Sequence, residues 1–99
     1  MKLKRLLNKK DHWTQGAYAR DEHGEIVRPS DSNAVCWCVL GGLMRCYPDR
    51  LERDKIEKKL REIINDNSKP YRYMGIVSWQ DYPTRTFEEV CELLEKANV

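Results

Sequence analysis

The stretch Ala34–Tyr47, AVCWCVLGGLMRCY, decides the fold of this 99-residue chain. It is apolar on almost every side, and a helix without a polar face is typical of the buried centre of a domain. The stretch is too short to cross a bilayer, and Pro48 ends it. We therefore expect a central helix over residues 34–47, with its N-cap at Asp31.

Two adjacent glycines, Gly41 and Gly42, lie inside this expected helix. Each costs about 1 kcal/mol of helix stability relative to alanine. We expect the close approach of a neighbouring helix, or of a hairpin backbone, to offset that cost. A bulky substitution such as Gly41→Leu should then prevent folding.

The segment before the central helix predicts a β-hairpin over residues 17–28. Short strand-like runs flank the polar sequence Asp21–Gly24, which ends in glycine as hairpin turns often do. Two strands alone are marginally stable, so this hairpin must pack against helices.

Apolar spacing predicts further helices on both sides of this unit. They cover residues 2–9, about 49–65, and the C-terminal segment from Thr86, where Thr86 and Glu89 match a capping box. Residues 71–79 fit either a short strand or one helical turn. The predicted fold is α+β and helix-dominated, a single domain over 1–99 with about four helices around the helix at 34–47 and one hairpin.

The charge composition argues against a dedicated DNA-binding protein. The 18 basic and 16 acidic side chains leave a net charge of +2, whereas DNA-binding domains are usually far more basic. Residues 1–10 nevertheless carry five basic side chains and no acid. They form either a solvated helix face or a basic N-terminal arm that contacts phosphate.

The four cysteines are predicted to be reduced and mostly buried. No signal peptide precedes them, so we expect a cytoplasmic protein. Cys36 and Cys38, two apart on a helix, would point about 200° apart and could not hold one metal ion together. We expect no metal and no cofactor.

Recognised catalytic motifs are absent from the sequence, which favours a non-enzymatic protein and leaves His12 and Asp81 as acid–base candidates. Polar and aromatic side chains in predicted loops are the better candidates for a site, since Trp and Arg dominate binding hot spots. The alternative is that they anchor the core and its turns. The predicted site residues are Trp13, Gln15, Arg20, Trp79, Asp81 and Arg85.

Three blocks of the chain resemble a family of small bacterial and bacteriophage proteins, a domain of unknown function. They are WTQGAYARDEHGEIVRPSD (13–31), AVCWCVLGGL (34–43) and the WQD and RTFEEV segments within 79–90. The resemblance implies that the hairpin, the central helix and the 79–86 loop form one unit, and that a phage accessory role is plausible. The family pattern has an asparagine where this chain has Gln80.

Three functions follow from these observations as hypotheses. The first is a small binding or regulatory accessory protein, phage-encoded and acting on a host protein. The second is a nucleotide-like ligand site between the hairpin and the 79–85 loop, with Arg20 and Arg85 holding an anion. The third is weak nucleic-acid binding through the basic N-terminal arm. A membrane partner is not expected.

Overall fold

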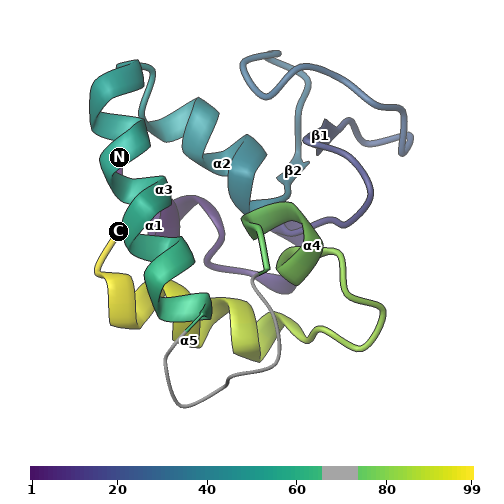
Figure 1. The fold of residues 1–99 in the computed structure, drawn as a ribbon. Helices are drawn as coiled ribbons and strands as arrows, with labels where there is room; N and C mark the ends of the chain where they lie inside the picture. Colours follow the sequence, from purple (N-terminus) through teal and green to yellow (C-terminus); the bar gives the residue numbers. More distant parts are fainter. Residues whose placement is uncertain (66–73) are drawn as a thin grey trace.

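The computed structural model describes residues 1–65 and 74–99. In this part of the chain, helices form most of the fold, and a short antiparallel pair of strands lies to one side of them (Figure 1). The predicted α+β class is therefore confirmed. The elements, in chain order, are α1 (Leu3–Leu6), the 3-10 turn η1 (Lys10–His12), β1 (Ala19–Arg20), β2 (Cys36–Trp37), α2 (Val39–Cys46), α3 (Arg50–Ile64), α4 (Ile76–Gln80) and α5 (Phe87–Ala97).

The central helix is shorter than predicted. Residues 34–38 do not belong to it, because Cys36 and Trp37 pair with β1 as strand β2. Helix α2 begins only at Val39. The stretch is apolar throughout because it contains a strand and a helix that are both largely buried. A continuous apolar run is typical of either element, so the sequence pattern alone does not tell them apart.

The N-cap of α2 also differs from the prediction. Cys38 occupies this position, and its Sγ accepts a hydrogen bond from the Gly41 backbone N–H at 3.2 Å. The Asp31 side chain instead accepts from the Asn33 N–H at 2.8 Å and closes a local turn. The N-cap lies later in the sequence than predicted because residues 36–37 pair as a strand, so the helix cannot begin before residue 38.

The expected turn at residues 21–24 is present, but the strands on its two sides pair over fewer residues than the predicted hairpin at 17–28. The Asp21 N–H donates to Glu25 O, and an isolated antiparallel bridge joins Arg20 to Ile26. The regular partner of β1 is β2, in the register Ala19 with Trp37. The strand β1 thus lies between residue 26 on one side and β2 on the other.

Both central glycines lie where a neighbour approaches closely, as expected. A Cβ on Gly41 would lie 2.0 Å from the Tyr18 backbone oxygen, in the segment leading into β1. A Cβ on Gly42 would lie 2.4 Å from Leu3 Cδ1 on α1. The pair of glycines therefore allows α2 to contact the hairpin backbone and α1 at once.

The remaining helices enclose the apolar core from the other side. Helix α3 packs on α5, and α4 lies against both α2 and α3 (Figure 1). The predicted capping box of α5 is present, with Thr86 and Glu89 exchanging both hydrogen bonds. Of the ambiguous segment 71–79, residues 76–79 are helical in α4, and 71–73 lie outside the described residues. The polar sequence at 65–70, which ends in proline, also predicts a loop, and residues 66–70 of it lie outside the described residues.

Candidate functional site

A single buried amide, that of Gln80 at the end of α4, holds together the segments that the sequence grouped as a site. The side chain is fully buried. Its Oε1 accepts hydrogen bonds from Trp13 Nε1 at 2.6 Å and from the Val39 N–H at 3.1 Å. Its Nε2 donates to Thr14 O at 3.0 Å and to Asp81 Oδ1 at 2.8 Å. Each polar group of the amide is therefore satisfied within the protein.

Gln15 and Asp81 extend this network toward the surface. Gln15 Nε2 donates to the backbone oxygens of Gln80 and Tyr82, at 2.9 and 3.0 Å. The Gly16 N–H donates to Asp81 Oδ1 at 3.1 Å. These bonds fasten the loop after η1 to the end of α4, so the two loops that the sequence placed in one unit do lie side by side.

Arg20 serves the same network from the hairpin side. Its Nε donates to Thr14 Oγ1, and its two terminal nitrogens donate to Gln15 O and Gly24 O, at 3.1–3.3 Å. The guanidinium is thus bound along its whole fork to neutral oxygens of the protein. In this arrangement Arg20 positions the loop and the turn and does not present its charge to a ligand.

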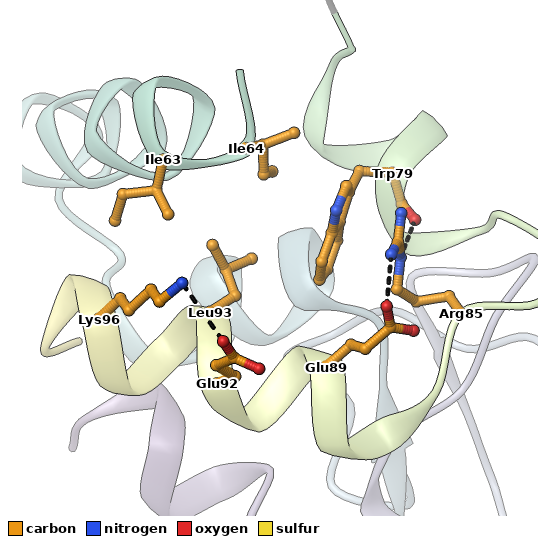
Figure 2. A pocket seen from close by; sticks show the side chains of 8 residues that line it. All are labelled: Ile63, Ile64, Trp79, Arg85, Glu89, Glu92, Leu93 and Lys96. Atoms are coloured by element: carbon orange, nitrogen blue, oxygen red, sulfur yellow. Dashed lines mark hydrogen bonds and ion pairs between the residues drawn. The ribbon is translucent and has the colours of Figure 1, made fainter. Parts of the chain in front are cut away.

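Trp79 of α4 and Arg85 of the loop after it lie against each other (Figure 2). The Arg85 guanidinium stacks over the Trp79 ring, 3.9 Å from its centroid. Its Nε donates to Trp79 O at 2.8 Å, and a terminal nitrogen pairs with Glu89 at 3.1 Å. Arg85 is therefore also occupied by contacts within the chain.

Beside this stack, a small pocket of about 130 Å³ opens between α3 and α5. Figure 2 shows apolar side chains at its base and charged ones along α5 at its rim. Lys96 pairs with Glu92 at 3.3 Å, so the rim charges are partly neutralised within α5. The pocket is lined by Ile63, Ile64, Trp79, Arg85, Glu89, Glu92, Leu93 and Lys96.

A larger and more apolar pocket, about 260 Å³, lies between the hairpin and α4. Its walls include Tyr18, Ile26 and Val77, which are 47%, 67% and 40% exposed. Asp81 is the one charged residue among the described residues that line it. We call this the hairpin pocket; its lining residues are Gly16, Ala17, Tyr18, Ile26, Cys38, Val77 and Asp81.

The Cys38 thiol lines the hairpin pocket but is poorly suited to act as a nucleophile. Burial raises its pKa, and the nearby Asp81 carboxylate raises it further, while the N–H donors of the α2 N-terminus, led by Gly41, oppose the shift. The thiolate is the reactive form of cysteine, so a raised pKa disfavours reaction at neutral pH. Cys38 acts here as the cap of α2.

The described residues hold no group of three or more His, Cys, Asp or Glu side chains that could bind a metal ion. The four cysteines are free thiols; Cys38 is buried and the other three are half-buried. Within residues 1–65 and 74–99, no helix is both long and apolar enough to span a membrane.

Comparison with known proteins places the chain in a family. The model of a family of unknown function, DUF6197, matches residues 2–98. The chain belongs to this family. Neither a curated protein nor a solved structure matches it significantly. The resemblance to an uncharacterised family is therefore confirmed, and the match covers nearly the whole sequence.

For this family member, the structure divides the six predicted site residues between two pockets and the hydrogen-bond network around Gln80. Of the six predicted residues, Asp81 lines the hairpin pocket and Trp79 and Arg85 line the smaller one. The sequence missed the exposed apolar walls, Tyr18, Ile26 and Val77. Their signal was weak, because single apolar residues in short strands and helices usually face the core.

Proposed function

We propose that this protein is a small, non-enzymatic binding protein that recognises another protein through the hairpin pocket. One observation carries the proposal: three exposed apolar side chains, Tyr18, Ile26 and Val77, converge on one apolar surface pocket. Single exposed apolar residues need no explanation, but a cluster around a pocket marks interaction surfaces. Tyrosine is also among the residues enriched at binding hot spots.

The backbone that carries these side chains is held firmly. Tyr18 O accepts the Cys38 N–H at 3.2 Å and packs directly against Gly41. On the opposite wall, Val77 lies in α4 between the buried residues Ile76 and Gln80. A surface that is ordered before binding loses less entropy when a partner arrives, which favours affinity.

The polar groups around the pocket support a binding role over a catalytic one. The Gln80 amide is fully engaged inside the protein, and the pKa of the Cys38 thiol is raised by burial. His12, the imidazole that the sequence offered as a base, contacts the Leu6 carbonyl through Nδ1 at 3.0 Å and does not line the pocket.

A nucleotide-like ligand has less support. That hypothesis needs Arg20 and Arg85 to hold an anion, yet Arg20 is bound to neutral oxygens and Arg85 to Trp79 and Glu89. The hairpin pocket itself has a carboxylate and apolar walls, which suit a phosphate poorly. Thermal-shift screening with nucleotides would reveal such a ligand through a rise in melting temperature.

Nucleic-acid binding through a free N-terminal arm also has less support. Residues 3–6 form a helix whose Leu3 side chain is fully buried. The ammonium groups of Lys2 and Lys4 both donate to Asn98 Oδ1 at 3.1 Å, so part of the basic charge is engaged. Arg5, Lys9 and Lys10 remain exposed. A gel shift that weakens with salt would revive this alternative.

The partner we propose is a host protein met in the cytoplasm. The resemblance to bacteriophage proteins favours a role of this kind, and the free cysteines fit a reducing compartment. The binding surface is small, so the expected complex is of the transient, regulatory type.

The test is a comparison of two surface variants of the full chain. Ile26→Asp places a charge on the hairpin pocket, and Leu51→Asp makes the same type of change at an exposed apolar residue of α3, which contributes nothing to that pocket. Quantitative mass spectrometry of proteins retained from bacterial lysate should show a partner that wild type and Leu51→Asp retain. Ile26→Asp should lose it.

Circular dichroism and thermal unfolding check that both variants fold. If every protein retained by wild type is also retained by a folded Ile26→Asp variant, the hairpin pocket is not the binding surface. If both variants lose the same partners, the effect is general and the proposal fails.

A further inference from the structure

The charge in the hairpin pocket indicates what kind of side chain it takes. Asp81 is half-buried and follows α4 directly. Its Oδ1 already accepts two hydrogen bonds, from the Gly16 N–H and from Gln80 Nε2. Its Oδ2 accepts no hydrogen bond from the described residues. The carboxylate is thus fixed through one oxygen, with acceptor capacity left on the other.

This carboxylate also lacks a cationic partner among the residues the structure describes. No Lys, Arg or His nitrogen of residues 1–65 and 74–99 lies within 4.0 Å of it. Arg20 bonds to the neighbouring Gln15 backbone, but its guanidinium is directed to Thr14, Gln15 and Gly24 and does not line the pocket. Within the described part of the chain, the negative charge in the hairpin pocket therefore has no ion-pair partner.

The apolar walls of the pocket affect which cationic groups bind to the Asp81 carboxylate. Tyr18, Ile26 and Val77 exclude water on the sides of the pocket when a ligand enters. Electrostatic attraction strengthens as water is displaced, because the local dielectric constant falls. Apolar walls also suit the methylene stem of a long cationic side chain, whose charged end must then meet a counter-ion.

We propose that the hairpin pocket binds a lysine or arginine side chain of the protein partner. The stem lies against Tyr18, Ile26 and Val77, and the cationic group donates to Asp81 Oδ2. Glu22 and Glu25, exposed in the turn before Ile26, add attraction for a basic segment. This inference rests on the proposed function and specifies the chemistry of the partner.

The experiment selects short random peptides on the immobilised full-length protein. Wild type should enrich sequences with a Lys or Arg next to an apolar residue, and Ile26→Asp should not retain them. Asp81→Asn is the decisive variant. Its amide oxygen can still accept from Gly16 and Gln80, so the fold is kept while the charge is removed.

For an enriched peptide, Asp81→Asn should weaken binding by about tenfold or more, as expected when a charge-assisted hydrogen bond is lost. Replacing the basic residue of the peptide by norleucine should weaken binding similarly, and the two changes together should cost little more than either alone. Glu62→Gln is the matched control, since it removes one negative charge from an exposed site on α3. It should leave the affinity within about twofold.

Two other outcomes separate the hypotheses. Peptides that bind in an Ile26-dependent way, yet show no basic preference or bind Asp81→Asn as well as wild type, overturn the inference and leave the proposed function intact. Failure to enrich any peptide that depends on Ile26 counts against both.

Discussion

At the scale of single residues, the Gln80 side chain holds distant segments of the chain together. One buried amide links Trp13, Thr14, Val39 and Asp81, which come from three distant parts of the chain. Buried polar groups are costly when unpaired, so such a network stabilises one arrangement of the loops over others.

Gln80→Leu should destabilise the protein strongly. The substitution keeps the volume roughly constant but removes the partners of the Trp13 indole N–H, the Val39 backbone N–H and Thr14 O at buried or part-buried positions. We expect a loss of about 3 kcal/mol or more in the free energy of unfolding, measured by urea denaturation. Gln15→Leu removes bonds at a half-buried position and should cost about 1 kcal/mol. Equal effects for the two variants would contradict the central role of Gln80.

At the scale of elements, Gly41 allows a close contact between α2 and the hairpin backbone. Tyr18 O would lie 2.0 Å from a Cβ at Gly41, whereas Gly42 faces the end of a flexible leucine side chain on α1. Backbone atoms bonded into a sheet cannot move aside as a side chain can. The two glycines are adjacent in sequence, but a side chain added at Gly42 is expected to be tolerated better than one added at Gly41.

Gly41→Ala should therefore cost more than about 3 kcal/mol in unfolding free energy, despite the better helix propensity of alanine. Gly42→Ala should cost about 1–2 kcal/mol, since Leu3 can adjust its rotamer. Gly75→Ala, where no atom lies within 4 Å of the added Cβ, should cost less than about 1 kcal/mol. Thermal and urea unfolding of the three variants gives the ranking, and a stable Gly41→Ala protein would refute the close contact.

At the scale of the whole molecule, residues near the N-terminus and the C-terminus lie side by side (Figure 1). The Lys4 N–H donates to Val99 O at 3.1 Å, and Leu3 and Val99 are both buried in the core. Helix α1 packs on both α2 and α5. The basic N-terminal segment is thus a structural part of the domain, although its sequence also fitted a free arm.

Leu3→Ala should destabilise the entire domain by about 2–5 kcal/mol, because it empties a fully buried site between α1 and α2. Lys2→Ala, which removes one exposed hydrogen bond to Asn98, should change the stability by less than about 0.5 kcal/mol. A single cooperative transition is expected for both variants. Loss of the N-terminal segment alone, seen as a separate early transition, would contradict this integration.

The sequence by itself determined the α+β class, the positions of α3 and α5, the capping box and the need for close contact at the two glycines. These features depend on local spacing and on the chemistry of one residue at a time. Only the tertiary structure decided that Cys36 and Trp37 form a strand, that Gln80 joins the loops, and that Tyr18, Ile26, Val77 and Asp81 share a pocket. Each depends on pairing between distant segments. A backbone hydrogen bond carries no side-chain signature, and an apolar residue has the same pattern whether it faces the core or a surface pocket.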